Sequence, residues 1–341
     1  MGAYRPGRRP AAGQQLARLA SNEMPFPLLS SVAAAINLAL IESNRYPDPA
    51  VTLLTERLAA KHDVTPDRVA VGCGSVQLVQ ELVEISCDAG DEVVYGWRSF
   101  EAYPTLTAVA GAVAVPVPLT DHHLDLDAMA AAVTDRTRLV ILCSPNNPTG
   151  TALLQTDVEA FLDAVPGHVL VVVDEAYAEF VDDPLAVNTF TLLDRYPNVV
   201  VVRTFSKAYG LAGLRVGYAV GAPSVAGALK QVHLPFSVTI AAQAGALASL
   251  DVEDVLLGQV AEIVTLREPL RQELLALGLE VPPAQGNFVW LPSPDAEAWS
   301  AAFERGGVLV RCFAGEGVRI TLGQPEDNER VVSVSRGLGG R

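Results

Sequence analysis

Residues 199–221, VVVVRTFSKAYGLAGLRVGYAVG, place reactive side chains where an apolar run ends. Four valines lead into Thr204, Ser206 and Lys207, and Arg215 follows eight residues after the lysine. A lysine amine becomes nucleophilic at neutral pH when burial and neighbouring cations lower its pKa. Hydroxyl groups and an arginine are also suited to holding a phosphate. The stretch predicts a reactive amine beside an anion site, with a solvated turn as the alternative.

Three other segments carry polar groups directly after apolar runs. In VGCGSVQ, Gly74 and Ser75 lie between an expected strand and an expected helix, where free amides attract a phosphate. CSPNNPTG, residues 143–150, can hold an asparagine amide rigidly, although it also suits an ordinary turn. In VVVDEAY, Asp174 follows three valines, so we expect it to be buried and to need a cationic partner. A protonated ring nitrogen of a cofactor would be such a partner.

Together these groups predict a site for pyridoxal 5′-phosphate (PLP). The set consists of Lys207, Asp174, Asn147, Tyr177 and a phosphate cradle of Ser75, Ser206 and Arg215. PLP needs a lysine for covalent attachment, a partner for its ring nitrogen and a place for its phosphate. A nicotinamide-dependent dehydrogenase is the alternative enzyme class, but GCGSVQ lacks the third glycine of a dinucleotide-binding turn.

Composition argues against several other classes of function. The chain has 341 residues, half of them apolar, and a net charge of −15, which argues against nucleic acid or an anionic membrane as a partner. Its four cysteines are scattered, as in reduced cytoplasmic proteins, and its five histidines show no metal-ligand spacing, so we expect no metal. The first residues do not resemble a signal peptide, and no apolar run approaches the roughly 20 residues of a membrane span.

The order of apolar segments predicts an α/β fold. From about residue 69, continuous Val/Ile/Leu runs alternate with helical patterns, as expected for a mainly parallel sheet covered on both faces. Ligands of such sheets bind at the carboxyl ends of the strands, where the unusual polar groups lie. From about residue 250 the pattern changes to a smaller α+β unit. We predict a large cofactor-binding domain at residues 46–249, a small domain from residues 16–45 and 250–341, and an N-terminal arm at residues 1–15.

The motifs PNNPTG, DEAY and SKAYGLAGLRVGY resemble those of the fold-type I, PLP-dependent aminotransferases of class I/II. The resemblance extends from SNEMPFP to VRITLG, nearly the whole chain. Within that group, WRSFEAYP and GCGSVQL are most similar to the histidinol-phosphate and aromatic branch, and closest to its aromatic (phenylalanine) aminotransferases. The resemblance implies a cytoplasmic homodimeric transferase of amino-acid biosynthesis, with active sites at the subunit interface.

The resemblance also implies a role for each cofactor-binding position. Lys207 would bond covalently to PLP and shuttle the proton at the substrate Cα, and Asp174 would pair with the ring nitrogen. Asn147 and Tyr177 would bind the phenolic oxygen, and Phe100 would stack on the ring. The phosphate would be held by Gly74, Ser75, Val76, Thr204, Ser206 and Arg215, and by Tyr46 of the neighbouring subunit.

Four positions are implied at the substrate end. Arg319 would clamp the α-carboxylate, Asn22 and Asn287 would line the substrate, and Arg311 would face its side chain or a second anionic group. Departures from the histidinol-phosphate pattern, such as Val76 after the Gly-Ser turn, fall near this end.

We therefore expect transamination of a phenylalanine- or tyrosine-type L-amino acid with 2-oxoglutarate, giving the aryl-pyruvate and glutamate. A histidinol-phosphate aminotransferase of histidine biosynthesis is the alternative. A PLP-binding regulator without enzyme activity is a further one, but it would need a basic DNA-binding module in a chain that is acidic.

Overall fold

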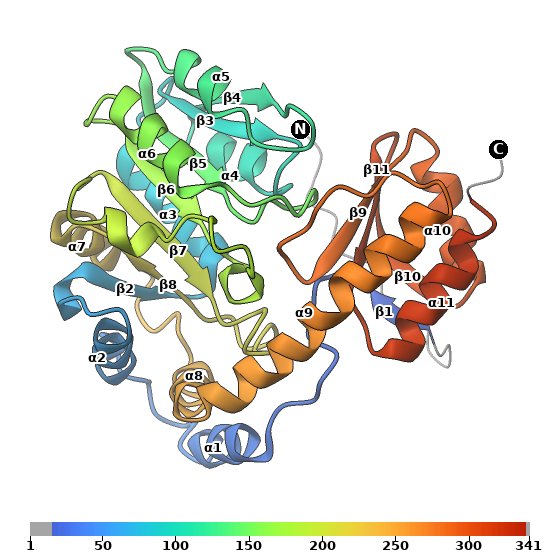
Figure 1. The fold of residues 1–341 in the computed structure, drawn as a ribbon. Coiled ribbons are helices and arrows are strands. Elements are labelled where there is room, and N and C mark those ends of the chain that lie inside the picture. The colour runs from blue at the N-terminus through green and yellow to red at the C-terminus, as the bar shows by residue number, and fades with distance from the viewer. Residues whose placement is uncertain (1–15, 339–341) are drawn as a thin grey trace.

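Two β-sheets, joined by one long helix, organise the chain in the computed structural model, which describes residues 16–338 (Figure 1). The expected N-terminal arm, residues 1–15, lies outside the described residues. The valine-rich runs form the strands of the larger sheet, as their continuous apolar character predicts. Between residues 16 and 338, no helix has both the length and the apolar character required to cross a bilayer.

The larger sheet has seven strands in the order β2-β8-β7-β6-β5-β3-β4. Their bounds are β2 Val69–Gly72, β3 Glu92–Trp97, β4 Val113–Pro118, β5 Thr137–Cys143, β6 Leu170–Asp174, β7 Val199–Thr204 and β8 Gly217–Val220. Strand β8 is antiparallel to both of its neighbours, and the other pairs are parallel. The carboxyl ends of β5, β6 and β7 therefore meet at one edge, and this edge carries the predicted chemistry.

Helices cover both faces of this sheet. They are α2 Thr52–Lys61, α3 Ser75–Ser86, α4 Tyr103–Val109, α5 Leu126–Ala131, α6 Gln155–Ala164 and α7 Pro223–Val232. Short 3-10 helices occupy Pro66–Arg68, Ala178–Phe180 and Thr189–Leu192. In β6, Val172 packs with residues of α3, α4 and α7, whereas Val171 and Val173 pack with residues of α2, α5 and α6. This alternation explains why β6 has no polar residue before Asp174.

The smaller sheet has four strands in the order β1-β10-β11-β9. It is built from β1 Ala17–Leu19, β9 Phe288–Pro292, β10 Val308–Phe313 and β11 Gly317–Thr321, with helices α10 Ala296–Arg305 and α11 Pro325–Ser335. Helix α9, Glu253–Ala276, runs from the larger unit to this sheet (Figure 1). In the antiparallel pair β10–β11, Arg311 lies directly opposite Arg319, so the two arginines share one face.

The segment between β1 and α1 connects the two units. After β1 the chain has no regular structure until α1, Ser30–Leu40, which contacts α8, Ile240–Asp251. The domain boundaries at residues 46 and 249 stay a prediction.

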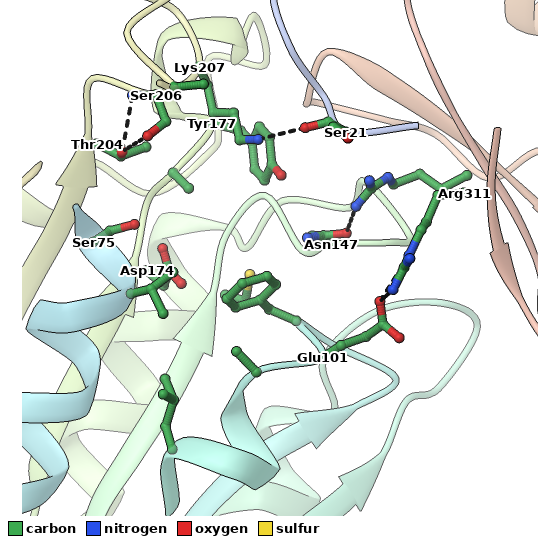
Figure 2. Close-up of a pocket in the computed structure, with 18 of the residues that line it drawn as sticks. Ser21, Ser75, Glu101, Asn147, Asp174, Tyr177, Thr204, Ser206, Lys207 and Arg311 are labelled. Atoms are coloured by element: carbon green, nitrogen blue, oxygen red, sulfur yellow. Dashed lines mark hydrogen bonds and ion pairs between the residues drawn. The ribbon is translucent and has the colours of Figure 1, made fainter. Parts of the chain in front are cut away.

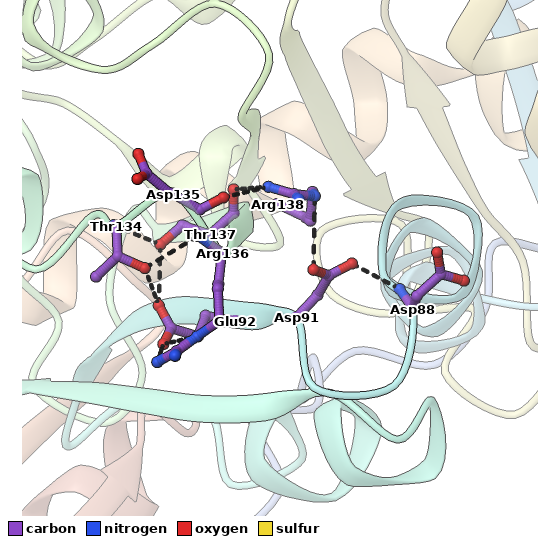
Figure 3. Close-up of polar contacts among 8 residues, drawn as sticks. All are labelled: Asp88, Asp91, Glu92, Thr134, Asp135, Arg136, Thr137 and Arg138. Carbon is purple, nitrogen blue, oxygen red and sulfur yellow. Dashed lines mark hydrogen bonds and ion pairs between the residues drawn. The ribbon is translucent and has the colours of Figure 1, made fainter.

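A polar cluster fixes the amino ends of β3 and β5, at the opposite end of the sheet from the predicted chemistry (Figure 3). Glu92 begins β3 and is buried, and it accepts hydrogen bonds from Thr134 at 2.5 Å and from Arg136. These bonds lower the pKa of the Glu92 carboxyl, with the Thr134 bond as the largest cause. The cluster joins the loop before β5 to its neighbouring strand.

Candidate active site

A cavity of about 520 Å³ lies at the carboxyl ends of the large-sheet strands and reaches the smaller sheet (Figure 2). Of the predicted site residues, those that line it are Ser75, Val76, Phe100, Asn147, Asp174, Tyr177, Thr204, Ser206, Lys207, Arg215, Arg311 and Arg319. Gly74, Asn22, Asn287 and Tyr46 are not among the lining residues. Segments as distant as α3 and β11 therefore contribute to one cavity.

Lys207, just after β7, points its amine into the cavity (Figure 2). Its Nζ donates a hydrogen bond to the backbone carbonyl of Ser21, at 2.8 Å. Burial lowers the pKa of Lys207 to about 7, and the charges of Arg319 and Arg215 lower it further, whereas Glu23 opposes them. The neutral, nucleophilic amine is consequently well populated near pH 7, unlike that of an ordinary lysine.

The start of α3 and the loop after β7 form an anion site. Gly74 has φ +83°, and a Cβ built on it would lie 2.5 Å from Nη2 of Arg215. No side chain caps α3, which leaves the amides at its start available to a ligand. On the other side, Nη1 of Arg215 and Oγ1 of Thr204 both donate to Oγ of Ser206, at 3.2 and 2.9 Å. A side chain at residue 74 would therefore collide with Arg215, so glycine at this position leaves room for the arginine of the anion site.

Asp174 ends β6 with one carboxylate oxygen bound and the other open. The hydroxyl of Tyr103 donates to Oδ2 at 2.7 Å, whereas Oδ1 is buried and has no hydrogen-bond partner among residues 16–338. Burial raises the pKa of Asp174 to about 6, although the bond from Tyr103 opposes this rise. A buried, unpartnered carboxylate oxygen is costly, so a protonated ring nitrogen would be stabilised there.

Tyr103 is a site residue that the sequence analysis did not identify. It is fully buried, and burial together with the charge of Asp174 raises its pKa well above the ordinary value. Its hydroxyl therefore remains protonated and can act as a fixed donor to Asp174. Its position in the motif WRSFEAYP, three residues after Phe100, was the available signal.

The substrate end is built around Arg319, which is buried. Its guanidinium donates to Oδ1 of Asn147 and, at 2.7 Å, to the backbone carbonyl of Ala20. Asn22 lies behind the cavity wall and donates to the hydroxyl of Tyr177 at 2.9 Å. Asn287 in turn donates to the carbonyl of Asn22 at 3.2 Å. Because the Tyr177 hydroxyl accepts from Asn22, its own proton is available to a ligand oxygen.

Arg311 and Tyr46 have neighbours within this chain that the sequence analysis did not identify. Arg311 forms an ion pair with Glu101 at the rim of the cavity (Figure 2). Tyr46 is 81% exposed and stacks on Phe236, with ring centroids 4.5 Å apart.

The residues present fit PLP. Lys207 supplies the amine for covalent attachment, and the open Oδ1 of Asp174 can accept a hydrogen bond from a protonated ring nitrogen. The start of α3, with Ser206 and Arg215, offers donors for the phosphate. These three parts are the ones that this cofactor needs from its protein.

Comparison with known proteins places the chain in a family. Residues 14–334 match the model of the family aminotransferase class I and II. The aromatic amino acid aminotransferase of Thermobifida fusca (strain YX) is 52% identical over 335 residues, covering 98% of this chain and 93% of that protein. The aromatic amino acid aminotransferase of Rhodococcus erythropolis (strain PR4 / NBRC 100887) is 51% identical over 334 residues, covering 97% and 92%.

A solved structure agrees with these matches. The histidinol-phosphate aminotransferase from Sinorhizobium meliloti, in complex with pyridoxal-5'-phosphate, has a TM-score of 0.87 to this chain. It is 30% identical, and the alignment covers 95% of this chain and 91% of that one. The predicted fold class and enzyme class are confirmed: this chain belongs to the class I and II aminotransferase family.

Proposed function

We propose that this protein uses PLP to transfer the amino group of a phenylalanine- or tyrosine-type L-amino acid to 2-oxoglutarate, giving the aryl-pyruvate and glutamate. The observation that carries the proposal is the placement of Lys207, the open carboxylate oxygen of Asp174 and the guanidinium of Arg319 around one cavity. The names of relatives about half identical over nearly the whole chain support the aromatic substrate.

The chain's own residues account for binding and proton transfer. PLP, when bound, supplies the electron sink for the carbanion formed at the substrate Cα. Lys207, with its pKa near 7, can accept the Cα proton as a neutral amine and return a proton afterwards. The carboxylate of Asp174 keeps the ring nitrogen protonated, and Arg319 binds the substrate carboxylate. Tyr177 and Asn147 would donate hydrogen bonds to the phenolic oxygen of bound PLP.

The rim of the cavity favours an aromatic ring over a phosphate ester. The walls include the apolar side chains of Val76, Ala102 and Leu106. Arg311 could meet a phosphate, but it already binds Glu101. A dianionic phosphate would therefore approach an arginine whose charge is already balanced, and it would be repelled by the carboxylate of Glu101. An aromatic ring would instead contact apolar side chains. Histidinol phosphate, suggested by the Sinorhizobium meliloti relative, is the second candidate substrate.

A homodimer is part of the proposal. Large apolar side chains are exposed on α1, just after α1, on α2 and just after α7, among them Leu38, Ile41, Leu53 and Leu234. Exposed apolar surface of this kind marks an interaction site, and a second copy of this chain is the occupant we propose. The exposed Tyr46 lies between α1 and α2, where it would reach the phosphate of the partner's site. A cytoplasmic location stays a prediction from the cysteine pattern.

A single-turnover experiment tests the substrate. The PLP-loaded protein is mixed in parallel with L-phenylalanine and with L-histidinol phosphate, and the visible absorbance of the bound cofactor is followed. We expect rapid loss of the band and formation of phenylpyruvate with phenylalanine, and slow loss with the phosphate ester. The reverse order would assign the enzyme to histidinol phosphate. In Lys207→Ala, PLP should still bind but turnover should disappear; unchanged turnover would rule out the assigned role.

A further inference from the structure

Glu101 and Arg311, which both line the cavity, form an ion pair between the two units. Glu101 follows β3 in the larger unit, whereas Arg311 lies in β10 of the smaller sheet, 210 residues away. Nε of Arg311 donates to Oε2 of Glu101 at 3.1 Å, and Nη2 donates to the same oxygen. Both residues line the cavity, and their side chains are 27% and 11% exposed. The pair is thus sheltered and directly accessible to a bound substrate.

This pairing determines which substrate side chains Arg311 can serve. Its Nε–Nη2 edge is one of the edges on which guanidinium binds a carboxylate, and Glu101 occupies it. An acidic substrate must displace Glu101 or leave two carboxylates beside one cation. An uncharged ring leaves the pair intact. Binding an acidic substrate in this cavity therefore costs more electrostatic free energy than binding an uncharged one.

We propose that Glu101 is a specificity-determining residue that competes with acidic substrate groups for Arg311. The inference rests on the proposed function, since an aromatic donor and 2-oxoglutarate must use this cavity in turn. Glu101 favours the uncharged ring only relative to acidic groups, because it weakens binding of the distal carboxylate of 2-oxoglutarate and leaves binding of the ring unchanged.

A second ion pair between the larger unit and the smaller sheet provides a matched control. Arg98 binds Glu316 in the turn between β10 and β11, again joining the larger unit to the smaller sheet. Arg98 also lies over the ring of Trp97, 4.3 Å from its centroid. Neither Arg98 nor Glu316 lines the cavity. Loss of the Glu316 charge therefore removes a contact between the two units without changing the charge that a substrate meets.

The test measures binding of two unreactive substrate mimics to the PLP-loaded enzyme by calorimetry. Glutarate carries a distal carboxylate, whereas 3-phenylpropanoate carries a ring. In Glu101→Gln we expect the Kd of glutarate to fall about tenfold, because Arg311 gains an open binding edge. The Kd of 3-phenylpropanoate should change by less than about twofold. The KM for 2-oxoglutarate should fall with the Kd of glutarate.

Three variants make the outcome decisive. Glu316→Gln should leave both Kd values unchanged, and Glu101→Gln combined with Arg311→Gln should lose the gain for glutarate. Glu101→Ala repeats the test if Glu101→Gln does not fold. An unchanged or weaker glutarate affinity in the folded Glu101 variant would overturn the role of Glu101. Failure of the wild-type enzyme to convert phenylalanine would instead overturn the proposed function, because glutarate binding does not depend on turnover.

Discussion

At the scale of single residues, the surroundings of Lys207 set its reactivity. Burial and the cations Arg319 and Arg215 bring its pKa to about 7, well below the ordinary value of 10.5. Because the neutral amine is the form that attacks PLP, its fraction rises with pH and levels off above the folded-state pKa. Lys207 can thus attack PLP at neutral pH without a separate base to remove its proton.

The pH dependence of PLP attachment tests this shift. The apoprotein is mixed with PLP between pH 5.5 and 9.5, and the rate of covalent attachment is followed by absorbance, with Lys207→Ala as background. We expect the rate to rise about tenfold per pH unit below 7 and to level off above about pH 8. Arg319→Gln should move the midpoint upward, because a cation that favours the neutral amine is removed. A rate that still increases above pH 9 would show an ordinary lysine.

Single residues also show the limit of the sequence analysis. Lys207, Asp174 and Asn147 could be identified because each follows an apolar strand, and the ends of parallel strands meet. Glu101 and Tyr103 were missed because their importance depends on partners distant in sequence: Arg311 lies 210 residues away and Asp174 lies 71 residues away. Spacing along the chain carries no signal for such pairs.

At the scale of elements, the turn before α3 requires glycine at residue 74. An alanine there would adopt φ +83°, and its Cβ would lie 2.5 Å from Nη2 of Arg215. Gly90 is a control, since its φ is +93° and, apart from its chain neighbours, no atom of residues 16–338 lies within 4 Å of a Cβ built on it. An alanine would be strained at either position, but only at residue 74 would its Cβ also collide with Arg215 of the anion site.

Substitution at the two glycines separates strain from cofactor binding. Gly90→Ala should lower the free energy of unfolding by about 1–2 kcal/mol, the usual cost of an L-residue at positive φ. Gly74→Ala should lower it by about 1–3 kcal/mol, because φ +83° with ψ 159° is a region that only glycine adopts readily. Only Gly74→Ala should also weaken PLP binding, by about tenfold or more, because Arg215 is displaced. Denaturant unfolding and PLP titration of the apoprotein measure the two effects. Equal PLP affinities in the two variants would contradict the assigned role of Gly74.

The Glu92 cluster gives the amino ends of β3 and β5 an acid-sensitive contact. Since the folded state lowers the pKa of Glu92, its contribution to stability is present above the ordinary value of 4.5 and is lost as pH falls through the folded-state pKa. Glu92→Gln should lower the free energy of unfolding by about 1–3 kcal/mol at pH 7. The difference from wild type should shrink below pH 4, as measured by urea unfolding. Asp135→Asn is the control, because residue 135 contributes only its backbone carbonyl, which accepts a hydrogen bond from Arg138. An equally large decrease in the free energy of unfolding of Asp135→Asn would contradict the prediction.

Other elements were beyond the sequence analysis for physical reasons. Strand β8 was not assigned from the sequence, and its antiparallel direction depends on the connection between Thr204 and Gly217, which only the fold defines. Helix α8, IAAQAGALASLD, is rich in small residues and has no clear apolar periodicity, so it was not assigned. The strands with continuous valines were identified because their pattern is unambiguous.

At the scale of the whole molecule, the described chain forms a site whose phosphate end the partner subunit would complete. Tyr46 is exposed on the apolar surface that we propose to be the dimer interface, and it stacks on Phe236 of its own chain. If Tyr46 contacts the phosphate in the neighbouring subunit's site, then a substitution of Tyr46 in one subunit weakens PLP binding in the other subunit. A heterodimer with different substitutions in its two subunits can therefore show which site Tyr46 belongs to.

Differently tagged Lys207→Ala and Tyr46→Ala subunits can be combined into a heterodimer and isolated. The Lys207→Ala homodimer should be inactive, and the Tyr46→Ala homodimer should need about tenfold more PLP for half saturation, through loss of a hydrogen bond to a charged group. In the heterodimer, the intact lysine of one subunit meets the intact tyrosine of the other, so one site is complete. We expect about half of the wild-type activity, with wild-type PLP affinity. If Tyr46 acts within its own chain, the only subunit with a lysine also lacks the tyrosine, and the weak PLP affinity of Tyr46→Ala should persist.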